Sequence, residues 1–240
     1  MHEKIISAVI SAAFVLMTAV PVCAQEENKL CYLENTDKAE FEVSAVSAIL
    51  IEADTATVLF SKNEKEHRQI ASTTKIMTAL LTLEAGEPDK EFQVDSAAIK
   101  VEGTSMGLRE GDKVTRRALC YGMLLPSGND AANAAAVNIS GSKTAFAKLM
   151  NSRAKEIGMN DTNFITPSGL DAEGQYSCAY DLAMLAREAM KNKDFAGICA
   201  LSKAKVSFGN PVSERWLINS NKLLTSYDGC IGVKTGFTDS

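Results

Sequence analysis

The stretch IASTTKIMTALL (residues 70–81) joins a run of hydroxyl side chains to a lysine and then to an apolar segment. Its apolar positions continue with helical spacing, and they share one face of the expected helix: Ile76, Ala79, Leu80 and Leu83. A soluble helix normally keeps lysine in water, yet Lys75 is followed directly by Ile76. Two interpretations follow, a helix cap beside a surface lysine or a serine nucleophile beside a lysine base.

The spacing of Ser72 and Lys75 favours the second interpretation. Side chains at positions i and i+3 of a helix lie on one face, so the lysine amine reaches the serine hydroxyl. Serine is a weak nucleophile until a base removes its proton, and lysine serves as that base when burial and a second positive charge lower its pKa. The apolar neighbours and Lys234 would supply both effects. A helix that begins at Ser72 would also offer backbone N–H groups to an oxyanion.

Two further motifs follow in the chain and complete a pattern. Ser-Gly-Asn occupies residues 127–129 and Lys-Thr-Gly occupies residues 234–236. Each short motif is common by chance. The order S-x-x-K, S-G-N, K-T-G is specific for serine enzymes that use a lysine base.

The secondary structure predicted around these motifs is mixed. A β-hairpin is expected at 43–52 and 57–61, with weak strands inside 91–114 and β-like runs at 204–208 and 231–237. Helices are expected after residue 72 and in four later segments, at 115–125, 130–139, 144–157 and 180–190. This order predicts an α+β protein in which strands from both ends of the chain share a sheet.

Taken together, the chain resembles the serine-type D-alanyl-D-alanine carboxypeptidases, the low-molecular-mass penicillin-binding proteins. The resemblance covers nearly all of residues 25–240. It extends to the segments SMGLREGDKVT (105–115), YGMLLPSGNDAANA (121–134), FITPSGLDAEGQYSCAYDLAMLA (164–186) and NSNKLLTSYDGCIGVKTGFTDS (219–240). It implies a β-lactamase/transpeptidase-like catalytic domain at 25–240. An antiparallel sheet from about 40–71 and 200–240 would pack with helices, beside an all-helical part at about 72–199.

The resemblance assigns roles to the motif residues. Ser72 would be the acylated nucleophile, Lys75 its general base and Ser127 the relay of a proton to the leaving amine. Asn129, Lys234, Thr235 and Gly236 would bind the substrate, and the backbone N–H groups of Ser72 and Phe237 would form the oxyanion hole. The implied substrate is a peptidoglycan stem peptide ending in D-Ala-D-Ala, with β-lactams as covalent inhibitors, no cofactor and no metal.

Two other functions share these motifs. A serine β-lactamase of class A uses an additional glutamate, and no E-x-x-L-N element with the required spacing lies between Asn129 and Lys234. A catalytically silent penicillin-binding receptor would keep the fold and lose turnover.

The ends of the chain carry separate expectations. Residues 1–24 place Lys4 before an apolar run and the small-residue pattern Val-Cys-Ala, which predicts a cleaved signal peptide and an extracytoplasmic bacterial protein, secreted or membrane-associated. Ser240 follows Gly236 by four residues. The resemblance implies two more strands and a helix after the K-T-G strand, so we expect a C-terminally truncated domain. Membrane attachment would need a further C-terminal segment.

Composition narrows the partners. A net charge of -5 with scattered Lys and Arg argues against nucleic acid. Five cysteines follow the leader without C-x-x-C spacing, so we expect mostly buried thiols rather than a disulfide framework or zinc site. His67 is expected in a solvated loop, and Trp216 is expected to be structural.

Overall fold

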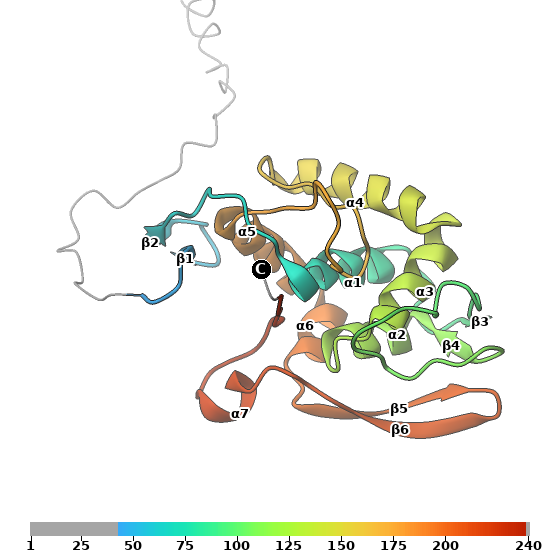
Figure 1. The fold of residues 1–240 in the computed structure, drawn as a ribbon. Coiled ribbons are helices and arrows are strands. Elements are labelled where there is room, and N and C mark those ends of the chain that lie inside the picture. The colour runs from blue at the N-terminus through green and yellow to red at the C-terminus, as the bar shows by residue number, and fades with distance from the viewer. Residues whose placement is uncertain (1–42, 239–240) are drawn as a thin grey trace, which may run out of the picture.

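Helix α1 (Lys75–Glu84) is the centre of the fold in the computed structural model, which describes residues 43–238. Every residue of α1 from Lys75 to Leu83 is buried. Five helices surround and contact it, α2 (Arg116–Leu124), α3 (Asn129–Ser140), α4 (Lys143–Ile157), α5 (Ala179–Met190) and α6 (Lys193–Cys199) (Figure 1). The helix that carries the S-x-x-K motif is therefore the core helix of the molecule.

Local sequence explains where these helices begin and end. The Thr115 hydroxyl accepts a hydrogen bond from the Ala118 N–H at the start of α2, and the Ser142 hydroxyl does the same for Ala145 in α4. Gly158 ends α4 with a φ of +88°, a left-handed conformation that costs glycine little. The four later helices predicted from the sequence are confirmed, and none of their bounds shifts by more than one residue.

The strands form three separate antiparallel pairs among the described residues. The pairs are β1 (Ala48–Ile51) with β2 (Val58–Lys62), β3 (Glu91–Gln93) with β4 (Lys113–Thr115), and β5 (Lys203–Gly209) with β6 (Val212–Ile218). In the longest pair, Val206, Phe208 and Leu217 are buried against the core. The short helix α7 (Leu223–Ser226) follows β6 and leads to the K-T-G segment.

The structure corrects two expectations about the sheet. Residues 231–237 were expected to be a strand, but they have no regular structure, because no other described strand lies beside them to pair with their backbone groups. For the same reason the two ends of the described chain do not share a sheet. The segment is held by other groups instead, including the Asn221 side chain, which donates to the Gly232 carbonyl at 3.2 Å.

The class expectation of an α+β protein is confirmed. Cys120, Cys178 and Cys199 are buried free thiols, as expected, and Cys230 is partly buried. His67 is exposed and stacks on Tyr176. The predicted signal peptide (residues 1–24) and Cys31 both lie outside the described residues. Within residues 43–238, no helix has both the length and the apolar character that crossing a bilayer requires.

Candidate active site

Ser72 lies in a short 3-10 helix, η1 (Ala71–Thr74), directly before α1. Ala71 enters this turn with a φ of +44°, a left-handed conformation that is strained for a residue with a side chain. Strain of this kind is found at functional sites, where surrounding packing enforces it. The turn places Ser72 at the mouth of a cleft while Lys75, one turn later, is fully buried.

The Lys75 amine is held by three oxygen atoms. Its Nζ lies 2.8 Å from Ser72 Oγ, 2.7 Å from Asn129 Oδ1 and 2.6 Å from the carbonyl oxygen of Ser168. Asn129 Nδ2 donates to the Glu102 carbonyl at 2.8 Å, which fixes Oδ1 toward the lysine. The amine therefore has one definite position, directed at the serine hydroxyl.

These three partners are chemically unequal. An amide oxygen and a carbonyl oxygen only accept hydrogen bonds, whereas a hydroxyl both donates and accepts. A neutral lysine amine has two protons and one lone pair, so it would donate to Asn129 and Ser168 and accept the proton of Ser72. The arrangement permits proton transfer from Ser72 Oγ to Lys75 Nζ across a distance of 2.8 Å.

Burial lowers the pKa of Lys75 to about 7, with the positive charge of Lys234 as the second cause and the negative charge of Asp130 opposing both. The sequence predicted this direction and both lowering causes. At neutral pH a large fraction of the amine is thus the free base.

The second motif forms one wall of the cleft. Ser127 has a φ of +66°, and its carbonyl accepts from the Thr104 hydroxyl at 2.6 Å. The Asn129 N–H donates back to the Thr104 carbonyl at 2.8 Å. These bonds join the start of α3 to the loop that contains Gly103 and Thr104, which both line the cleft.

Asp130 fastens the same loop from below. Its buried carboxylate accepts hydrogen bonds from the Ser105 hydroxyl and from three backbone N–H groups of the loop, those of Met106, Gly107 and Leu108, and also from the N–H of Ala131. A carboxylate with several N–H donors is well stabilised without a counter-ion. Asp130 therefore positions the 103–108 loop over the Ser127–Asn129 turn.

The K-T-G segment forms the opposite wall and lies against η1. A Cβ at Gly236 would be 3.1 Å from the Ile70 carbonyl oxygen and 3.3 Å from the Thr73 nitrogen, so only glycine fits without displacement. Figure 1 shows the C-terminal end of the described chain beside the start of α1. The Thr235 hydroxyl is 2.8 Å from that of Ser220, which also lines the cleft.

Lys234 is half-buried, and its amine donates to the Thr235 carbonyl at 2.7 Å. Burial lowers its pKa to about 8. Its side chain is not part of the cleft lining, although it is close enough to influence Lys75 electrostatically. Lys234 is therefore beside the cleft and not among its lining residues, whereas the sequence predicted it to bind the substrate carboxylate.

The walls enclose a cleft of about 740 Å³. Ser72, Ser127, Asn129, Thr235, Gly236 and Phe237 all line it, together with Gly103, Thr104, Gly169, Leu170, Asp171, Ser220 and Thr238. The three sequence motifs thus share one cavity. Phe237 is 84% exposed at the rim.

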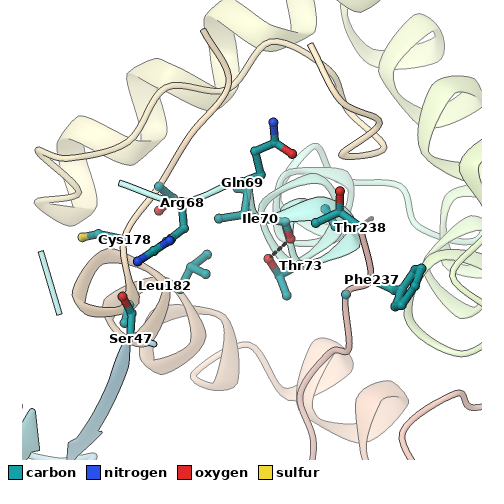
Figure 2. A pocket seen from close by; sticks show the side chains of 13 residues that line it. Ser47, Arg68, Gln69, Ile70, Thr73, Cys178, Leu182, Phe237 and Thr238 are labelled. Atoms are coloured by element: carbon teal, nitrogen blue, oxygen red, sulfur yellow. Dashed lines mark hydrogen bonds between the residues drawn. The ribbon is translucent and has the colours of Figure 1, made fainter. Parts of the chain in front are cut away.

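A second cavity of about 270 Å³ lies on the other side of the K-T-G segment, between it and α5. Figure 2 shows Ser47, Cys178 and Leu182 on one side of this cavity and Phe237 and Thr238 on the other, with the Phe237 ring directed away from it. The Thr73 hydroxyl donates to the Ile70 carbonyl there, so Thr73 does not contribute its hydroxyl to the cleft. The 236–238 segment is consequently a thin wall between two hollows.

The loop that supplies the Ser168 carbonyl was missed as a site element. It belongs to the segment 164–186, and its Gly169 packs on the residue that precedes Ser72. Ser220, Thr104 and Asp171 were missed as well. Asp171 follows a Pro-Ser-Gly turn signal that could have directed attention to it.

Gly169 provides a test of how this loop holds the lysine. Its φ is +82°, and a Cβ would lie 1.9 Å from the Ala71 carbonyl oxygen. We expect Gly169→Ala to destabilise the protein by roughly 3–5 kcal/mol, because the backbone must move. Gly174→Ala is the matched control, with a φ of +80° and its nearest atom 3.9 Å away, so it should cost only the roughly 1–2 kcal/mol of left-handed strain. Equal losses in thermal unfolding would contradict the close contact.

A helix-borne serine bonded to a buried lysine, facing an S-G-N turn and a K-T-G segment across one cleft, defines a class: the penicillin-binding serine proteins with a lysine base. The chain belongs to the D-alanyl-D-alanine carboxypeptidase family, whose model matches residues 34–240.

Individual relatives agree with this assignment. The chain is 36% identical to the D-alanyl-D-alanine carboxypeptidase DacF of Bacillus subtilis over 98% of its own length and 60% of that protein. It is 37% identical to DacB2 of Mycobacterium tuberculosis over 80% of its length and 66% of that protein. The crystal structure of the Streptomyces K15 DD-transpeptidase superposes with a TM-score of 0.77 at 33% identity, covering 82% of each chain. The chain thus spans about 60% of the length of the Bacillus relative.

Proposed function

We propose that this chain carries the catalytic site of a serine DD-carboxypeptidase that removes the terminal D-alanine of peptidoglycan stem peptides. The observation that carries the proposal is the Lys75 amine, 2.8 Å from Ser72 Oγ with its other two partners restricted to accepting hydrogen bonds. Family membership and the shared cleft support the same reaction.

The proposed reaction proceeds through an ester on Ser72. Lys75 Nζ takes the hydroxyl proton as Ser72 Oγ bonds to the carbonyl carbon of the penultimate D-alanine, and the backbone N–H groups of Ser72 and Phe237 stabilise the oxyanion. Breaking the C–N bond releases D-alanine, whose amine receives the proton that Lys75 took. Ser127, which lines the same cleft, is the proposed relay for this proton once the substrate is bound. Water then attacks the ester, and Ser72 recovers its proton as the shortened peptide leaves.

Substrate binding is proposed for the opposite wall. Thr235 and the positive charge of Lys234 would hold the terminal carboxylate, and Asn129 would contact the peptide. Gly236 lacks a side chain, which lets the substrate backbone lie close to the segment. A β-lactam presents a carboxylate and a strained amide to the same groups, so it should acylate Ser72. The predicted leader would place this reaction outside the cytoplasm.

Two measurements test the proposal. We expect release of D-alanine from diacetyl-L-Lys-D-Ala-D-Ala, and intact-mass spectrometry should show a long-lived adduct with benzylpenicillin. Rapid loss of the adduct would indicate a β-lactamase instead. An adduct without D-alanine release would indicate a silent receptor.

A further inference from the structure

Asp171 is the only charged side chain in the lining of the 740 Å³ cleft, taken over the residues that the structure describes. It is exposed, and its Oδ2 accepts a hydrogen bond from the Thr238 hydroxyl at 3.1 Å. Its other oxygen, Oδ1, has no hydrogen bond or ion pair within residues 43–238. Among the described residues, the cleft therefore contains one carboxylate that makes no ion pair.

The position of Asp171 follows from two close contacts at the floor of the cleft. Gly169 packs on the Ala71 carbonyl, and Gly236 packs on Ile70 and Thr73. Asp171 lies two residues after Gly169, and Thr238 lies two residues after Gly236. The hydrogen bond between them joins these two segments across the cleft. At the other end of residues 235–238, the Thr235 hydroxyl is hydrogen-bonded to the Ser220 hydroxyl.

The proposed function gives the substrate a direction along this wall, and the inference rests on that function. With the terminal carboxylate at Thr235, an extended peptide that follows residues 235–238 advances about 3.3 Å per residue. The residue before the two alanines then comes to the Thr238 end, where Asp171 lies. A carboxylate at that point favours a positively charged side chain over a neutral one.

We propose that Asp171 is a specificity-determining residue that binds the side-chain ammonium of a diamino acid directly preceding D-Ala-D-Ala. Lysine-type and diaminopimelate-type side chains share this ammonium. The Oδ1 atom accepts it while Oδ2 keeps its bond to Thr238. The ammonium of the substrate thereby forms an ion pair with the Asp171 carboxylate.

The test compares two peptides that differ in one charge. These are Nα-acetyl-L-Lys-D-Ala-D-Ala, which has a free ammonium, and its Nα,Nε-diacetyl form, which has none. We expect the wild-type protein to favour the free ammonium by about threefold to fivefold in kcat/KM, the range for a partly exposed ion pair. The preference should shrink as ionic strength rises.

Two variants separate charge from the cross-cleft bond. Asp171→Asn keeps an oxygen that accepts from Thr238 but removes the charge, so the ratio of the two rates should fall to about one. Thr238→Val opens the bond and keeps the charge, so it should retain the preference. Benzylpenicillin acylation, measured beside each, reports the chemistry of Ser72 separately.

The outcomes distinguish the inference from the proposed function. A preference that survives Asp171→Asn, or one that is lost equally in Thr238→Val, would overturn the ammonium site. Release of D-alanine by the wild type at equal rates from both peptides would overturn it as well, and would leave the carboxypeptidase intact. Failure to release D-alanine from either peptide would remove the proposed function and the inference together.

Discussion

Ser72→Ala should abolish D-alanine release and the benzylpenicillin adduct, with a loss on the order of 10⁶-fold in turnover. The physical reason is that the reaction requires a covalent bond to Oγ, and the structure offers Lys75 no other hydroxyl within hydrogen-bond distance among the described residues. The fold should remain, because Ser72 is only half-buried and Lys75 retains two of its three partners. Intact-mass spectrometry and a thermal melt measure both results.

Ser127→Ala is the matched control for this experiment. Ser127, in the S-G-N motif, lines the same cleft as Ser72 in the S-x-x-K motif. It should slow acylation but still form the adduct, and peptide mapping should locate the adduct within residues 70–81. An adduct that persists in Ser72→Ala and disappears in Ser127→Ala would reverse the assigned roles.

The contact between Ser72 and Lys75 could be predicted from sequence because the relation of the two residues is local. Residues 72 and 75 meet by helix geometry alone, and the lowered pKa follows from apolar neighbours. The Ser168 carbonyl could not be predicted in this way. It lies 93 residues from Lys75, and a backbone carbonyl has no residue type that would mark it. The packing of Gly169 on Ala71 and the hydrogen bond from the Thr78 hydroxyl to the Pro167 carbonyl bring it to the amine.

The strand expected at 231–237 shows that a local pattern can predict an element that the structure does not form. Alternating β-favouring residues indicate an extended segment, but a strand exists only where a neighbour accepts its backbone hydrogen bonds. The sequence prediction also missed strand β6, although a local signal for it was present. The Asn210-Pro211 turn signal after 204–208 indicates a hairpin, and residues 212–218 continue it as the partner strand.

The pH dependence of acylation provides the second large effect, and it depends on two lysines with different pKa values. In its proposed role Lys75 would act as a base only when it is neutral, so the rate should rise as pH increases through about 7. In its proposed role Lys234 would hold a carboxylate only when it is charged, so the rate should fall as pH increases through about 8. The expected profile is a narrow bell between these values.

Variants of the two lysines should remove the two sides of this pH–rate profile separately, the acid limb below pH 7 and the alkaline limb above pH 8. Lys75→Met should lower the acylation rate by about 10³-fold to 10⁴-fold and lose the acid limb, since no base remains. Lys75→Arg should be equally slow, because a guanidinium does not release its proton in this pH range.

Lys234→Met should lose the alkaline limb and also move the acid limb to higher pH, since removing a nearby positive charge lets Lys75 keep its proton longer. Stopped-flow measurement of benzylpenicillin acylation across this pH range follows both limbs in each variant. An acid limb that stays in place in Lys234→Met would contradict electrostatic coupling between the two amines. A wild-type rate that does not change through pH 7 would contradict Lys75 as the base, because the neutral fraction of its amine changes most steeply there.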